Sequence, residues 1–404
     1  MYNIYRKLGH WLLLGLCAGS LFACVNSDDD TPAKKTQEDI FVALDLAALR
    51  AHGEDTEDPG ITEHGTDVEL KEDKIETLRM LMYPASSSET TPAKYNIAFE
   101  QSDVNSNRFV FKIKYEDLGM NDLVFIANGP SGKGLEDPKL TREKIKSIKV
   151  DLTNITNDKT GSGRPDAFLM TAEYNDAYFT KALSGRGTQS NPYRINLTTQ
   201  NLAQRPSIKG DRSGAEMMRA LAKMEIRLKD AISIKVKEDG TKEYEWALPF
   251  GFAPGSALEL KFKNIPKAYY LLPRKALTDI PVTDEILYHF DFNKNAINPD
   301  YIDLPAELEP SIGGIRTADY KIYVYLPEYL TKKDLPKNKQ PGVEIVYKRA
   351  DGKPSEPKFY PIQNGGATHY DKILSGLERG ESSIYRNRFY KVTVRITGNE
   401  VVVP

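Results

Sequence analysis

The sequence has few cysteines and histidines and no strong excess of either charge. Of its 404 residues, 2 are cysteine and 5 are histidine, and the formal net charge is −2. Both cysteines, Cys17 and Cys24, lie near the N-terminus. The rest of the chain can therefore form no disulfide and no cysteine-based metal or catalytic site. The near-neutral charge also provides no basic face for nucleic acid.

The sequence also lacks the common signatures of enzymes. Ser184-Gly185-Arg186-Gly187 is not a nucleophile elbow, and the sequence has no Gly-Lys-Ser/Thr loop that would bind phosphate. The histidines are scattered, without pairs at metal-ligand spacing. His52 and His64 lie among acidic residues, where a weak metal site can be imagined, but a solvated loop is the simpler interpretation. We therefore expect no enzymatic activity, no cofactor and no metal.

The N-terminal segment has the parts of a secretory signal in their usual order. Basic residues precede a short apolar run, Trp11–Leu16. A membrane-spanning helix needs about 20 apolar residues, so this run is too short to be one. The following Leu21-Phe22-Ala23-Cys24 resembles the lipobox of bacterial lipoproteins. The resemblance implies that residues 1–23 are a signal peptide and that the Cys24 thiol receives the lipid, because a thiolate is a strong nucleophile.

An acidic segment, Ser27–Asp30, follows the lipobox. It resembles the signal that sends lipoproteins of this kind to the outer face of the outer membrane, although a solvated linker has the same composition. A strand is then predicted at residues 40–46, because large apolar residues alternate there and share one face: Ile40, Val42, Leu44 and Leu46.

A lone arginine, Arg50, separates this strand from an acidic tract. The tract runs from Ala51 to Asp73 and holds nine acidic residues and one lysine. This composition indicates an exposed flexible segment, which suits access by a protease. We predict cleavage between Arg50 and Ala51, which makes residues 24–50 a propeptide with a removable first strand. The plain alternative is that Arg50 is one loop arginine among many.

The remainder of the chain predicts a mainly β fold. Short alternating segments between turn residues are typical of β-sandwiches, and the 22 tyrosines and 24 prolines favour strands and structured loops. One modest helix is expected around residues 140–147. The length suggests two sandwich domains, residues 51–214 and 215–404. The expected strands are Thr77–Tyr83, Arg108–Tyr115, Leu123–Ala127, Phe168–Thr171, Tyr193–Leu197, Met218–Leu228, Leu258–Phe262, Lys321–Leu326, Gly342–Lys348 and Tyr390–Ile396.

Taken in order, these pieces resemble the FimA/Mfa-type fimbrillins of Bacteroidales, the type V pilins. The resemblance implies two tandem transthyretin-like, Greek-key β-sandwich domains after the signal and propeptide. It also implies trimming after Arg50 by an arginine-specific protease, then donor-strand exchange into cell-surface fimbriae that mediate adhesion. The matching segments are the lipobox, the strand 40–46 with Leu49–Gly53, the strand pair 77–83 and 123–128, Phe168–Glu173, Arg219–Ile226 and Arg386–Val392.

The predicted exchange has a simple physical basis. If the first strand leaves, four large apolar side chains vacate their groove, which withdraws about 6–12 kcal/mol of burial. The neighbouring strands keep unpaired N–H and C=O groups, an edge that recruits another strand. Because such a contact is head-to-tail, it propagates as a filament. The expected partners are therefore other fimbrial subunits, with a host or bacterial surface receptor as a further possibility.

The C-terminal end predicts the position of the subunit. After the last expected strand only residues 399–404 remain, and six residues span at most about 20 Å. Shaft subunits of the family carry a longer C-terminal extension that serves as the donor. This favours a tip or accessory subunit. Two alternatives stay open: a fimbrial anchor that keeps its lipid in the outer membrane, and a surface glycan-binding lipoprotein of a nutrient-uptake system.

Overall fold

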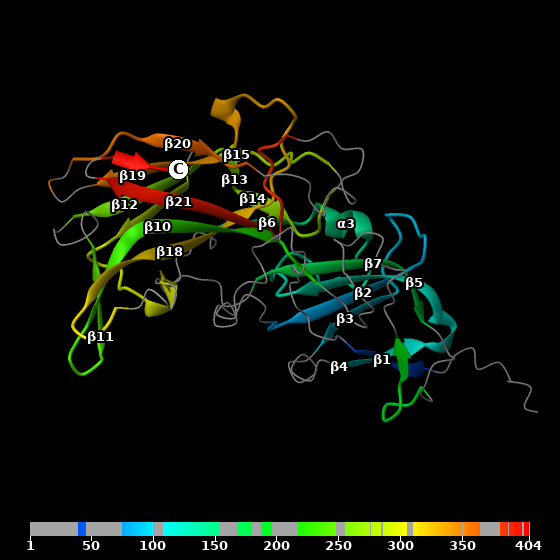
Figure 1. Ribbon diagram of the computed structural model, residues 1–404. Helices are drawn as coiled ribbons and strands as arrows, with labels where there is room; N and C mark the ends of the chain where they lie inside the picture. Colours follow the sequence, from blue (N-terminus) through cyan, green and yellow to red (C-terminus); the bar gives the residue numbers. More distant parts are fainter. Residues whose placement is uncertain are drawn as a thin grey trace, which may run out of the picture.

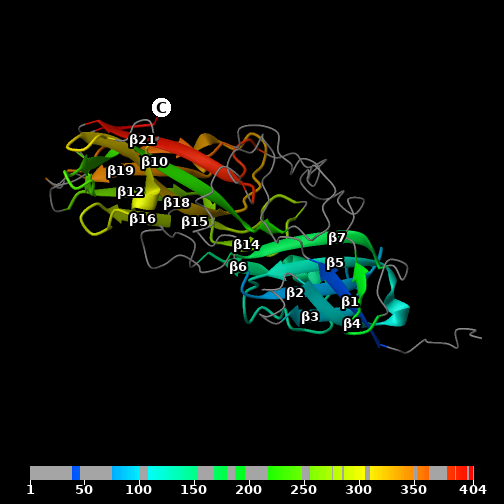
Figure 2. The ribbon, with the colours of Figure 1, turned by 60° about the horizontal axis from the view of Figure 1, so that its bottom comes forward.

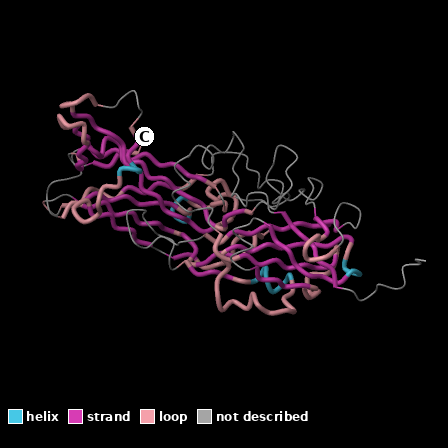
Figure 3. The backbone as a smooth tube through the Cα atoms, turned by 90° about the horizontal axis from the view of Figure 1, so that it is seen from below, coloured by secondary structure: helices cyan, strands magenta, loops and turns pink. Residues whose placement is uncertain are grey.

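The computed structural model describes two β-rich bodies, and strands make up most of the described chain (Figures 1 and 3). The N-terminal sandwich comprises β1–β5 and β7–β9, and the C-terminal sandwich comprises β10–β12 and β16–β22. The described residues are 39–45, 75–99, 108–152, 168–179, 187–195, 217–247, 255–274, 276–283, 286–304, 310–348, 351, 353–363, 380–386, 388–397 and 400–403.

One layer of the N-terminal sandwich is an antiparallel sheet that is five-stranded in the described residues, in the order β3-β2-β5-β7-β9. Its central strands are buried on both faces, since Met80 and Leu81 lie on opposite faces of β2 and both are fully buried. The strands are β2 (Leu78–Pro84), β3 (Tyr95–Phe99), β5 (Gly119–Ala127), β7 (Met170–Phe179) and β9 (Met218–Arg219).

The second layer is a smaller sheet in the order β4-β1-β8, formed by β1 (Asp39–Asp45), β4 (Arg108–Lys114) and β8 (Tyr193–Ile195). It closes the sandwich over an aromatic and aliphatic core. That core includes Met80 and Phe125 from the larger sheet and Val42 and Phe111 from the smaller one. A short 3-10 helix, η2 (Tyr115–Asp117), follows β4.

The C-terminal sandwich pairs two sheets across an aromatic core centred on Trp246. The Trp246 ring contacts Phe290, Phe292 and Tyr320 edge-on, with centroids 4.8–5.6 Å apart. The sheets have the orders β17-β18-β10-β21-β22, with β11 also on β10, and β16-β12-β19-β20. Their strands are β10 (Leu221–Val236), β11 (Lys242–Trp246), β12 (Ala257–Lys263), β16 (Ile286–Asp291), β17 (Ile302–Asp303), β18 (Ile315–Pro327), β19 (Gly342–Lys348), β20 (Lys358–Pro361), β21 (Phe389–Thr397) and β22 (Glu400–Val402).

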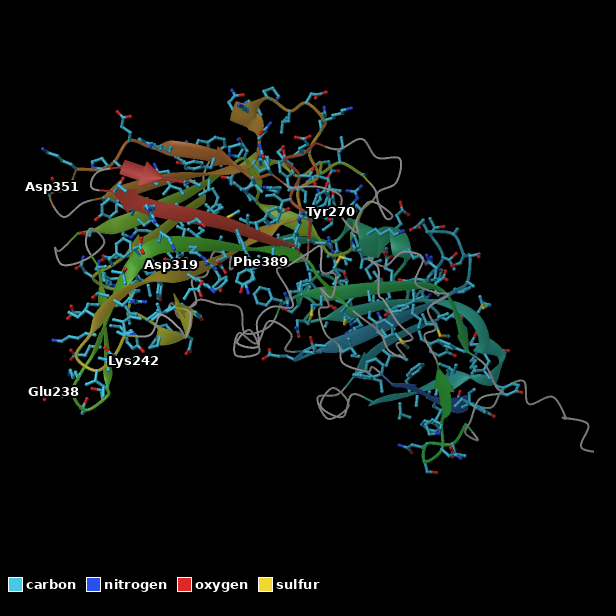
Figure 4. All side chains as sticks on the ribbon, in the orientation of Figure 1. Glu238, Lys242, Tyr270, Asp319, Asp351 and Phe389 are labelled. Carbon is cyan, nitrogen blue, oxygen red and sulfur yellow. The ribbon has the colours of Figure 1, made fainter. Side chains whose placement is uncertain are left out.

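The two sandwiches lie end to end and share a buried junction (Figure 2). A strand from the first half, β6 (Lys149–Asp151), pairs with β14 (Ala268–Tyr270) of the second half. The Phe168 ring packs on the Tyr325 ring across the junction, with the ring centroids 4.5 Å apart. In Figure 4, Tyr270 and Phe389 lie toward this junction, whereas Glu238 and Lys242 mark the far end of the β10–β11 hairpin. The remaining elements are the helix α3 (Arg142–Ser147), β13 (Ile265–Pro266), β15 (Val282–Thr283), η4 (Pro299–Tyr301) and η6 (Lys337–Lys339).

Buried Arg386 supports the second-half side of the junction, next to β14. Its guanidinium donates to the carbonyl oxygens of Leu271 (3.1 Å) and Tyr270 (3.0 Å) and forms a 2.9 Å ion pair with buried Glu328. Charged groups that are this deeply buried require such partners. The predicted domain limit between residues 214 and 215 lies outside the described residues.

The structure confirms the mainly β prediction and refines the strand limits. The expected helix is α3, whose first turn is capped by Thr141, because the Thr141 hydroxyl accepts from the Lys144 N–H at 3.2 Å. The strand expected at Phe168–Thr171 instead begins at Met170 and continues to Phe179, because Phe168 packs at the junction. The segment expected as one strand, Met218–Leu228, is divided, since Met218–Arg219 pairs with β7 and β10 begins at Leu221.

Candidate functional site

The first described strand, β1, is the central strand of its sheet. It pairs antiparallel with β4 over all seven residues, from Asp39 opposite Lys114 to Asp45 opposite Arg108. On its other side it pairs parallel with β8, with Val42 opposite Tyr193. A central strand uses backbone hydrogen bonds on both edges. Without β1, the described parts of β4 and β8 would have no strand between them.

The inward face of β1 completes the core. Ile40 and Val42 point into the core of the N-terminal sandwich and are 8% and 1% exposed. The register places Ile40 opposite Ile113 and Val42 opposite Phe111, so each aliphatic side chain lies beside an apolar one of β4. The backbone of Leu44 pairs with Phe109, and Leu46 lies outside the described residues.

Over residues 39–43, the outward face of β1 becomes more buried from Asp39 to Ala43. Asp39 is exposed and its carboxylate pairs with exposed Lys112 at 2.5 Å. Phe41 is half-buried, and Ala43 is completely buried. An exposed ion pair contributes little, about 0–1 kcal/mol. Burial of side chains, and not charge, therefore holds this strand.

β4 is anchored by contacts that do not involve β1. The rings of Phe109 and Phe111 pack edge-on against Phe99 of β3, with centroids 4.7 and 6.1 Å apart. At the other end, the Lys114 N–H donates to the Tyr95 hydroxyl at 2.7 Å, and that hydroxyl donates to Asp117 at 2.6 Å. Burial, with this second hydrogen bond, raises the pKa of Tyr95 above its ordinary value. β4 thus has its own support from the larger sheet.

β8 has less independent support. In the described part of the chain its strand partner is β1, over three residue pairs. The Phe41 N–H extends this contact by donating to the Gly187 carbonyl at 2.9 Å. Gly187 has φ +69°, and a Cβ there would lie 2.4 Å from the Tyr193 ring. Glycine is therefore required where the segment before β8 turns against Tyr193.

The sequence predicted the strand 40–46 but not its neighbours in the sheet. The alternation of Ile40 and Val42 is confirmed as an inward-facing pattern. No pattern in the sequence indicated β8 as the second neighbour of β1 or the burial of Ala43. The predicted lipidation residue Cys24 and the predicted cleavage site, Arg50 and Ala51, lie outside the described residues.

The described residues contain neither a metal-binding cluster nor a membrane-spanning helix. No group of three or more His, Cys, Asp or Glu side chains in the described ranges is arranged to hold a metal ion. Within the same ranges, no helix is both long and apolar enough to cross a membrane.

Comparison with known proteins gives matches among solved structures. No family model and no curated protein sequence matches the chain significantly. The tip fimbrial protein Mfa3 from Porphyromonas gingivalis, with a C-terminal truncation, aligns over 91% of this chain and 98% of its own, with a TM-score of 0.49 and 15% identity. A protein from Parabacteroides distasonis described as a cell adhesion protein aligns over 92% and 96%, with a TM-score of 0.44 and 13% identity.

A protein from Bacteroides eggerthii, also described as a cell adhesion protein, aligns over 91% of this chain and 95% of its own. Its TM-score is 0.40 and its identity is 12%. At such scores the function has to be inferred from the chain's own residues. The chain is similar, over most of its length, to proteins described as fimbrial or adhesive.

Proposed function

We propose that this chain is a structural subunit of cell-surface fimbriae, exported as a lipoprotein and assembled by donor-strand exchange. The observation that carries the proposal is the place of β1. A strand near the N-terminus, upstream of the predicted cleavage site at Arg50, fills the middle of a sheet and completes a core. A cut after Arg50 leaves β1 attached to the rest of the chain by non-covalent contacts alone.

The energy of those contacts suits a removable strand. Burial of Ile40 and Val42 is worth about 3–6 kcal/mol. Backbone hydrogen bonds to β4 and β8 add to this, but water replaces them when the strand leaves. While β1 is covalently joined to the rest of the chain, these contacts keep it in the sheet. After cleavage, an incoming strand at high effective concentration can replace it.

The site left by β1 would accept a strand in one direction. β4 keeps its support from Phe99 and Tyr95, so its edge remains in place with unpaired backbone groups. A strand that enters antiparallel to β4 runs parallel to β8, as β1 does. Addition of a strand with alternating apolar residues restores both the hydrogen bonds and the core. Because donor and acceptor regions differ, the contact is head-to-tail and extends into a filament.

Within the fimbria we place the subunit at the tip or in an accessory position. Its last described strand, β22, is used in its own domain: it pairs with β21, and buried Val401 accepts at its carbonyl from Lys358 at 2.9 Å. Such a strand is poorly suited to leave as a donor. The partners proposed are neighbouring fimbrial subunits, an arginine-specific protease acting at Arg50, and a lipid on Cys24 that holds the precursor in the outer membrane.

The intact mass of the protein purified from fimbriae and from outer membranes tests this function. The proposal expects a mature N-terminus at Ala51 in the fimbrial fraction. A chain that keeps an acylated Cys24 in every fraction would contradict it, and would favour the anchor or the glycan-binding lipoprotein. Immunogold labelling of intact fimbriae then tests the position, because a tip subunit is labelled at the ends.

A further inference from the structure

Among residues 39–43 of β1, whose side chains the structure describes, neighbouring residues on opposite faces are both fully buried at one place. Val42 on the inward face is 1% exposed and its neighbour Ala43 on the outward face is 0% exposed. Of the other outward residues whose side chains the structure describes, Phe41 is half-buried and Asp39 is exposed. The space available on the outward face therefore decreases along the strand toward Ala43.

Ala43 lies where the sheet is complete on both sides. It is opposite Val110 of β4 and Arg194 of β8, so backbone runs along both of its edges. A larger side chain at a filled site forces its neighbours to shift, which is unfavourable. Alanine is also the smallest residue of the strand, whose sequence is Asp-Ile-Phe-Val-Ala-Leu-Asp.

We propose that the site left by β1 selects its incoming strand by size, and requires a small side chain at the position of Ala43. The partner is a β-strand in which aliphatic residues take the positions of Ile40 and Val42 and a small residue follows directly. This inference rests on the proposed strand exchange and adds a rule for which strands can take part in it.

The fully buried position of Ala43 also fixes the register of the strand. A slip of two residues keeps the inward face inward but brings Phe41 or Asp45 to the buried position. A slip of one residue brings Val42 or Leu44 there, and also turns the apolar face outward. Each of these side chains is larger than alanine. The size limit therefore rejects misaligned strands as well as unsuitable ones.

Peptide exchange on the full-length precursor tests the rule. The precursor is cut at Arg50 with an arginine-specific protease, and β1 is displaced by excess fluorescent peptide corresponding to residues 38–47. Fluorescence anisotropy measures binding, and hydrogen exchange of β4 amides reports whether the peptide occupies the site. Three variants are compared with the native peptide: Ala43→Leu, Ala43→Gly and Asp39→Leu.

The native peptide is expected to bind and to protect β4. Ala43→Leu should bind about tenfold more weakly or worse, the effect of overfilling a packed site. Ala43→Gly should stay within about fivefold of the native peptide, because it costs only backbone entropy. Asp39→Leu places the same leucine on the same face where there is room, and should also stay within about fivefold.

The outcomes distinguish the size rule at the position of Ala43 from strand exchange itself. If Ala43→Leu binds as well as the native peptide, the size rule is wrong while strand exchange stands. If the native peptide fails to enter the cut protein, strand exchange at this site is wrong, and the size rule fails with it.

Discussion

Replacing Val42 with alanine should weaken the packing of β1 in the N-terminal sandwich by an amount that can be calculated. Val42 is 1% exposed in the N-terminal core, opposite Phe111 and Tyr193. The change removes two buried carbon groups worth about 0.8 kcal/mol each, and the cavity left behind raises the cost to about 2–3 kcal/mol. That corresponds to a factor of about 30–150 in the opening equilibrium of the strand.

Native-state hydrogen exchange on the uncut chain measures this opening directly. Protection of the β4 amides should fall by that factor in Val42→Ala, because they are exposed when β1 leaves. Asp39→Ala is the matched control in the same strand, since it removes an exposed ion pair with Lys112 and should cost less than about 1 kcal/mol. Equal protection of β4 in the two variants would refute the inference that core burial retains β1.

Three other changes make further predictions. Arg50→Lys keeps the charge but resists an arginine-specific protease, so it should leave the fold intact and stop incorporation into fimbriae; normal assembly would count against the mechanism. Gly187→Ala should destabilise the protein by about 1–3 kcal/mol more than Gly240→Ala. Both glycines have positive φ, but only the first would place its Cβ against the Tyr193 ring, and thermal unfolding measures the difference. Burial raises the pKa of the Glu173 carboxyl, and the charge of Lys146 partly opposes this rise. The ionised carboxylate is therefore unfavourable in the folded state, and stability is lost as the pH rises through the pKa of the folded chain. Glu173→Gln should be more stable than the native chain at pH 7, and the gain should shrink toward pH 4. A gain that is constant with pH in denaturation curves would contradict this assignment.

Local sequence patterns were sufficient to predict the mainly β fold and the inward face of the first strand. Alternation of Ile40 and Val42 specified which side chains enter the core, because side chains of a strand point to opposite faces in turn. The same rule applies to Met224 and Ile226, which alternate along β10 and are both buried in the core of the C-terminal sandwich. This alternation involves only consecutive residues, so it can be recognised in a single sequence.

Which strands lie side by side depends on long-range contacts that only the folded chain makes. Pairing of β1 with β8 joins residues about 150 positions apart over only three pairs, and no local pattern encodes so short a parallel contact. Glu225 on the outward face of β10 is another example: a charged residue in an alternating strand predicts exposure, yet it is 1% exposed and bonded to Arg227 and Tyr323. Burial of a second face depends on what packs over the sheet. Ala43 is a third example, because the sequence alone does not show whether a small residue in a strand is exposed or buried. Its complete burial depends on what packs around it in the folded chain.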